Sequence, residues 1–128
     1  MANTLGNPTL VSDKARENNI LSYNSTLTST PSVANPILRI RASSTTLVDF
    51  LLDATTPFTG GAVDGAATFN FASATAVATA GTATIPTNYQ VLGRDGVVHL
   101  SGNITATDGI SVGQTVSAGS ITATAPAS

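Results

Sequence analysis

From residue 37 onward, apolar and polar positions alternate with the period of two that is typical of β-strands. In the segment 37–41, Leu38 and Ile40 fall on one side of the predicted strand, and Arg39 and Arg41 fall on the other. Apolar runs and alternating segments further along the chain predict strands over residues 46–52, 68–71, 72–84, 90–92, 97–100 and 113–125.

A β-hairpin is the clearest local prediction. Residues 93–96, Gly-Arg-Asp-Gly, separate the apolar segments 90–92 and 97–100. An Asp-Gly pair favours a tight turn because glycine adopts positive φ at no steric cost. By contrast, residues 55–65 contain Pro57 and a Gly-Gly pair, and we expect a loop there.

The last predicted strand, residues 113–125, changes its apolar parity. Val116 and Ala118 occupy even positions, whereas Ile121 and Ala123 occupy odd ones. We expect a β-bulge at the intervening Gly-Ser pair, because a bulge would turn the later side chains inward again. About six to eight short strands predict a mainly β protein, specifically an antiparallel β-sandwich that is jelly-roll-like or immunoglobulin-like.

A single short α-helix is predicted before the strands, over residues 13–24. Arg16, Ile20, Tyr23 and Leu27 recur at the spacing of one helical face. Asparagine, serine and threonine dominate the segment after Ile20, and these weak helix formers are expected to end the helix early.

Two regions follow from this pattern. Residues 1–11 contain Asn, Pro and Gly and are expected to form an extended N-terminal arm. The segment 28–35 contains Ser, Thr and Pro and is expected to be a linker. We therefore expect an arm, helix and linker over 1–35 and a β-sandwich domain over 36–128.

Composition removes several classes of function. Charged residues make up 9% of the chain, which has five basic residues and a formal net charge of −2, so we expect no nucleic-acid partner. The absence of cysteine excludes disulfide scaffolds, thiol catalysis and Cys-based zinc sites. The sequence contains neither a secretory signal pattern nor an apolar run of bilayer length, so we expect a soluble chain without a membrane partner.

The side chains offer little acid–base or metal chemistry. His99 is the single histidine, so no second His and no Cys can complete a metal site with it. Asp64, Asp95 and Asp108 each precede a glycine, where an aspartate stabilises its own turn. We therefore expect no enzyme activity, no catalytic residue, no metal or cofactor and no small-molecule substrate.

The low charge instead favours assembly. A small β protein with so few charges exposes mainly Thr, Ser, Ala and Asn. Such a surface loses its water at lower cost than a Lys/Glu surface does, which suits contacts with neighbouring proteins. Exposed strand edges without charges also favour self-association, so we expect a homo-oligomer.

Strand and turn segments across residues 15–126 share a pattern with a known group of proteins. They are Ala15-Arg16-Glu17-Asn18, Ile37-Leu38-Arg39-Ile40, Thr46-Leu47-Val48 through Pro57-Phe58, Ala80 to Thr84, Val91 to Val98, Ser101 to Thr105, Ile110 to Val116 and Ile121 to Pro126. Together these segments resemble small virion-associated proteins of tailed bacteriophages. The resemblance implies a structural role on or between capsid subunits.

The expected function is therefore that of a non-enzymatic capsid decoration or cement protein, which lies on the capsid surface of the virion and binds the major capsid protein. Eight residues are predicted to contact the partner: Asn3, Leu5, Leu10, Arg16, Ile20, Tyr23, Arg39 and Arg41. The alternative is a tail- or fibre-associated module that engages a receptor through exposed aromatic side chains, for which Tyr89 and Phe58 form the best pair. A carbohydrate-binding β-sandwich is disfavoured, because the chain has no Trp.

Overall fold

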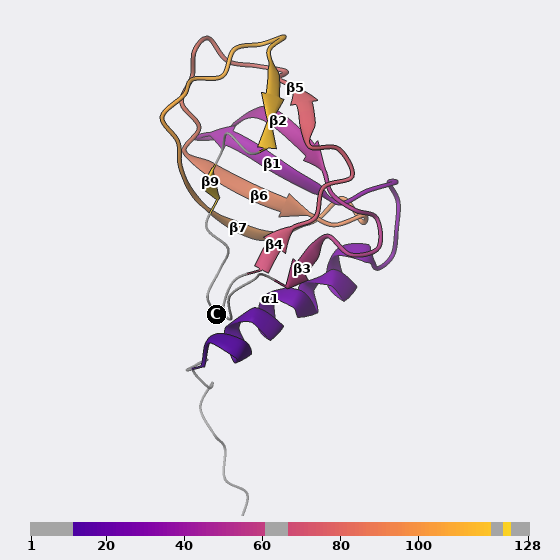
Figure 1. The fold of residues 1–128 in the computed structure, drawn as a ribbon. Helices are drawn as coiled ribbons and strands as arrows, with labels where there is room; N and C mark the ends of the chain where they lie inside the picture. Colours follow the sequence, from indigo (N-terminus) through magenta and orange to yellow (C-terminus); the bar gives the residue numbers. More distant parts are fainter. Residues whose placement is uncertain (1–11, 61–66, 119–121, 124–128) are drawn as a thin grey trace, which may run out of the picture.

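The protein is mainly β and is built around one five-stranded antiparallel sheet (Figure 1). The computed structural model describes residues 12–60, 67–118 and 122–123. The strand order in the sheet is β2-β1-β6-β7-β9. These strands are β1 (Ile37–Ala42), β2 (Thr45–Leu51), β6 (Asn88–Leu92), β7 (Val98–Thr105) and β9 (Thr122–Ala123).

The remaining described elements are one helix and two small sheets. Helix α1 spans Asp13–Thr28, strands β3 (Phe58–Gly60) and β4 (Ala67–Phe69) form one antiparallel pair, and β5 (Thr75–Val77) and β8 (Thr115–Ser117) form another. Figure 1 shows α1 beside the β3–β4 pair, below the large sheet, with the β5–β8 pair at the opposite end. The predicted class, a sandwich-like antiparallel β protein with one preceding helix, is confirmed, while the predicted extended arm lies outside the described residues.

One side of the large sheet forms the core. In β1, Leu38 lies opposite Phe50 and Val91, and Ile40 lies opposite Val48 and Tyr89. These side chains are all buried. Alternation of the side chains across the pleat explains the pattern, and the predicted inward direction of Leu38 and Ile40 is confirmed.

Helix α1 packs against the same core. Its Ile20 and Leu27 are fully buried and belong to one apolar cluster with the inward residues of the sheet. The side chain of Asn24 ties the helix to β3, because its Nδ2 donates to the Phe58 carbonyl (2.8 Å) and its Oδ1 accepts from the Phe58 N–H (2.7 Å). The helix and the strands therefore share one core.

The helix continues four residues beyond the predicted end at residue 24. Propensity alone disfavours the Asn, Ser and Thr residues there, but tertiary contacts override such preferences. Leu27 is fully buried, and the Arg94 N–H donates to the Leu27 carbonyl (2.7 Å) at the helix end. Thr28 Oγ1 donates back to the Asn24 carbonyl. The predicted early end was therefore wrong.

Aromatic side chains gather inside the molecule. The ring centroids of Phe58 and Phe69 lie 4.9 Å apart, and Phe69 also lies 6.2 Å from Phe71 and 6.3 Å from Tyr89. Phe71 meets Phe50 edge to face at 5.9 Å. These rings pack with the buried Leu, Ile and Val side chains in the same apolar cluster.

Three predicted elements differ in the structure. The predicted loop 55–65 contains strand β3, and the predicted strand 72–84 is reduced to β5. Further along, Gly81 (φ 111°) and Ala83 (φ 49°) have left-handed backbones, which a strand does not contain. The predicted last strand is two strands, because β8 pairs with β5 whereas β9 pairs with β7. The bulge predicted at residues 119–120 falls outside the described residues. The hairpin around residues 93–96 is confirmed.

Replacing Asn24 with Ala should lower the free energy of unfolding by about 1–3 kcal/mol, because the backbone N–H and C=O of Phe58 lose their partner. Urea unfolding of the full chain measures this loss. Ser25→Ala, one position along on the exposed side of α1, should stay within about 0.5 kcal/mol of the unmodified chain. Equal effects of the two substitutions would contradict a stabilising role for the two hydrogen bonds between Asn24 and Phe58.

Candidate docking face

The second side of the large sheet points away from the core, and we call it the outer face. Four strands build it, in the order β2, β1, β6 and β7. Because these strands are paired in register, their outward side chains form three rows that run across the sheet. The rows differ in chemistry.

The first row is apolar and lies at one end of the outer face. Ile37 is paired with Leu51 on one side and with Leu92 on the other, and Leu92 is paired with Val98. Leu51 and Val98 at the two ends of the row are 43% and 42% exposed, whereas Leu92 is buried. The row therefore exposes two aliphatic side chains, one at each end, and the side chain of Leu92 between them is buried.

The middle row contains an internal ion pair. Arg39 Nε donates to Asp49 Oδ1 at 2.9 Å, and Nη2 of Arg39 donates to Asp49 Oδ2 at 3.1 Å. The hydrogen bonds to Asp49 raise the pKa of Arg39. This bidentate geometry fixes both side chains, although a partly exposed ion pair of this kind adds little stability. Arg39, predicted to contact a partner protein, thus has an acidic partner in its own chain.

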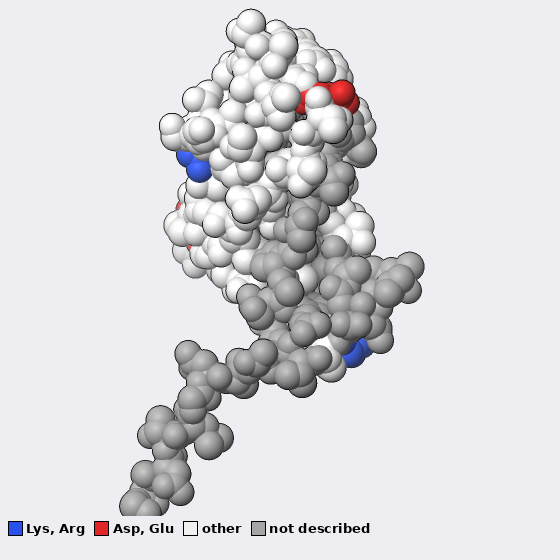
Figure 2. Space-filling view, turned by 90° about the vertical axis from the view of Figure 1, so that its left-hand side faces the viewer, with Lys and Arg blue, Asp and Glu red and all other residues white. Residues whose placement is uncertain are grey.

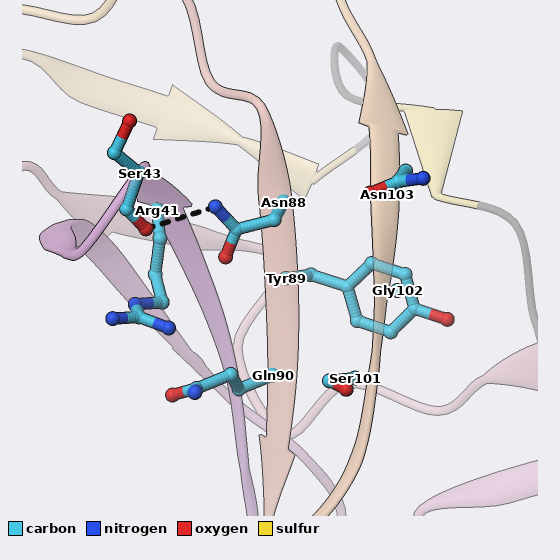
Figure 3. A pocket seen from close by; sticks show the side chains of 8 residues that line it. All are labelled: Arg41, Ser43, Asn88, Tyr89, Gln90, Ser101, Gly102 and Asn103. Carbon is cyan, nitrogen blue, oxygen red and sulfur yellow. Dashed lines mark hydrogen bonds between the residues drawn. The ribbon is translucent and has the colours of Figure 1, made fainter.

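The third row lines a shallow polar cleft of about 320 Å³ (Figure 3). Arg41 on β1 lies beside Asn88 on β6, and Asn88 is paired with Asn103 on β7. Asn88 Nδ2 donates to the Ser43 carbonyl at 2.9 Å and to Thr87 Oγ1 at 3.1 Å. Its amide is therefore held in place. The remaining lining residues are Ser43, Tyr89, Gln90, Ser101 and Gly102.

A close contact between two strands supports the cleft from the core side. Gly102 is paired with Tyr89, and a Cβ at Gly102 would lie 2.7 Å from a ring carbon of Tyr89. The tyrosine ring therefore needs a glycine opposite it. Burial of the ring raises the pKa of Tyr89, so its hydroxyl is neutral at physiological pH.

Among the residues predicted to bind a partner, those whose side chains the structure describes do not all lie in one place. Asn3, Leu5 and Leu10 lie outside the described residues, as does the side chain of Arg16 in α1. Ile20 is 1% exposed and packs in the protein's own core, so its side chain is not accessible to a partner. Tyr23 is half-buried against the same core. Of the predicted set, Arg39 and Arg41 lie together on the outer face.

The aromatic pair expected for receptor binding is also internal. Phe58 and Tyr89 are each 1% exposed and belong to the core cluster. The prediction that these two rings are exposed on loops was wrong, because the chain uses its few aromatic residues to fill the interior.

Sequence reasoning missed a side-chain contact between His99 and Asp95, at the turn between β6 and β7. His99 Nε2 lies 2.9 Å from Asp95 Oδ2, and Asp95 Oδ1 accepts the Val97 N–H at 3.1 Å. The backbone bond from Val97 and then the bond from His99 lower the pKa of Asp95. The spacing of four residues between Asp95 and His99 was visible in the sequence, but this contact depends on the bulge in β7.

Among the described residues, no group of three or more His, Cys, Asp or Glu side chains gathers to hold a metal ion. A helix long and apolar enough to span a membrane is likewise not found among them. No family model, curated protein or solved structure matches this chain.

The substitution Asp95→Asn should reduce the loss of folding stability that occurs as the pH falls. Because the folded state lowers the pKa of Asp95, its stabilising contribution is present above the pKa of the unfolded chain and is lost as pH falls through the folded value. The variant should therefore be less stable at neutral pH and approach the unmodified chain in acid. Urea midpoints across this range measure the difference.

Some acid sensitivity should persist in the Asp95→Asn variant. The backbone N–H groups of Thr56 and Thr55 lower the pKa of Asp53 in the same direction. A constant offset between the two chains at every pH would show that Asp95 does not contribute through its charge.

Proposed function

We propose that this chain is a non-enzymatic virion structural protein that decorates the capsid surface of a tailed phage and stabilises the major capsid protein lattice. The observation that carries the proposal is the outer face, a sparsely charged sheet surface. Its three rows hold one neutralised ion pair and the single further cation Arg41. The resemblance of the sequence to small virion-associated proteins supports the same proposal.

The surface chemistry suits lasting contact with another protein. Figure 2 shows one side of the molecule, where charged side chains appear in a few separate spots and the other described residues carry no charge. Uncharged polar and aliphatic groups lose their water at lower cost than Lys or Glu, and charged residues are depleted at the centres of protein interfaces.

The outer face alone is small for a stable interface. Four strands and three rows of side chains span about 14 Å in each direction, which gives a footprint of about 200 Å². A stable interface buries about 800 Å² on each partner. We therefore assign further contacts to residues 2–11. Many copies on one shell, and oligomers of this chain, would add their weak contacts together.

Quantitative mass spectrometry of purified particles tests the proposed function directly. A decoration protein is expected in hundreds of copies per particle, because it repeats with the capsid lattice. A few copies per particle would instead support the tail- or fibre-associated module that engages a receptor. Absence from purified particles would refute both.

Deleting residues 2–11 should abolish binding to particles that lack the protein, while the circular dichroism spectrum of the β fold stays the same. The reason is that the described elements, which share one core, begin after this segment. Sedimentation of particles with each chain measures occupancy. Equal occupancy by the shortened and full chains would contradict the assignment of partner contacts to residues 2–11.

A further inference from the structure

We propose that the cleft around Arg41 binds a carboxylate group on an acidic loop of the neighbouring protein. The inference rests on the proposed function for the identity of that neighbour, the capsid shell. The side chains of the cleft determine which chemical group it binds, and binding of a small carboxylate probe can be measured without particles.

Two arginines on strand β1 differ in their surroundings. Arg39 and Arg41 both point to the outer face, but the charge of Arg39 is compensated by Asp49 in the next strand. At the corresponding place beside Arg41 that strand provides Thr46. Within the described part of the chain, the guanidinium of Arg41 has no hydrogen bond or ion pair, and none of the residues that line the cleft is acidic. The cleft therefore has an uncompensated positive charge.

Neutral polar groups surround this charge. Figure 3 shows Arg41 on the side of the cleft where Asn88 and Gln90 also extend, with Ser101 and Asn103 on the strand opposite. An arginine fork matches the two oxygens of a carboxylate. The Asn88 amide already uses its Nδ2 as a donor and offers its Oδ1 as an acceptor, whereas the Gln90 and Asn103 amides can both donate and accept. Together they can pair with the peptide groups on either side of an aspartate or glutamate. Together these groups suit an acidic residue within a peptide chain.

The composition of the cleft favours a protein over an acidic sugar. Sugar rings are commonly held against exposed aromatic faces, but Tyr89, the aromatic residue at this cleft, is 1% exposed. The volume of about 320 Å³ lies at the lower end of the range of ligand pockets, about 300–1,000 Å³. The exposed aliphatic residues Leu51 and Val98 lie on the same face, about 14 Å away along the strands. A protein surface can reach both places at once.

A nuclear magnetic resonance titration of the full chain tests the cleft without particles. The probes are N-acetyl-aspartate N-methylamide, its neutral asparagine counterpart, and galacturonate as the acidic sugar. We expect saturable shifts of the Arg41 Nε–H and of the Asn88 and Gln90 side-chain amides with the aspartate probe, and weaker shifts with the other two. No saturable shift, or equal shifts with the asparagine probe, would overturn the proposal. Tighter binding of galacturonate than of the aspartate probe would contradict the proposal and indicate that the ligand is a sugar acid.

Three variants separate the role of Arg41 from net charge. Arg41→Gln should lower the affinity for the aspartate probe by about tenfold, which corresponds to the loss of one hydrogen bond to a charged group. Arg41→Lys should lower this affinity less. Lys14→Gln removes the same charge from helix α1 and should leave binding unchanged. The Arg41 carbonyl, which accepts from the Thr87 N–H, is retained in every variant. Amide spectra and urea midpoints verify folding.

The same variants are then added to particles that lack the protein. We expect Arg41→Gln to dissociate about tenfold faster than the unmodified chain, and Lys14→Gln to behave like the unmodified chain. If the unmodified chain binds particles and Arg41→Gln binds equally well, the cleft proposal fails and the proposed function stands. If no chain binds particles although the aspartate probe binds the cleft, the proposed function fails instead.

Discussion

The antiparallel register of β1 between β2 and β6 is the constraint on which the rest of the structure depends. It places Leu38 and Ile40 against Phe50, Val48 and the β6 side chains inside the core. The side chains between them are then forced to the other side of the sheet, because successive residues alternate. A shift of one residue would bury two arginines and expose two aliphatic side chains, so the buried side fixes the register strongly.

The chemistry of the outer face follows from this register together with one irregularity. Between Ile40 and Arg41 the pairing with β2 shifts by one residue, and the extra residue, Leu47, is fully buried. Asp49 therefore lies beside Arg39, whereas Thr46 lies beside Arg41. The same strand pair thus neutralises one arginine and leaves the other uncompensated within the described residues, and the polar cleft forms around the second.

Alternation in the sequence was enough to predict that Arg39 and Arg41 share a face and that residues 93–96 form a hairpin turn. Both features depend on neighbouring residues alone. The ion pair between Arg39 and Asp49 was not predicted, because it requires the pairing of two strands and the position of a bulge. The helix end at Thr28 and the burial of Tyr89 and Phe58 were missed for a related reason, since contacts with distant segments determine them.

The use of aromatic residues links the core to the outer face. In a chain rich in Ala, Thr and Ser, the clustered rings of Phe50, Phe58, Phe69, Phe71 and Tyr89 fill the interior. The outer face consequently carries aliphatic, amide, hydroxyl and guanidinium groups and the carboxylate of Asp49. Such groups give modest affinity at a single site, because aromatic residues are frequent among the residues that dominate binding energy. A surface of this composition is suited to a partner that repeats many times, where the number of contacts replaces the strength of each one.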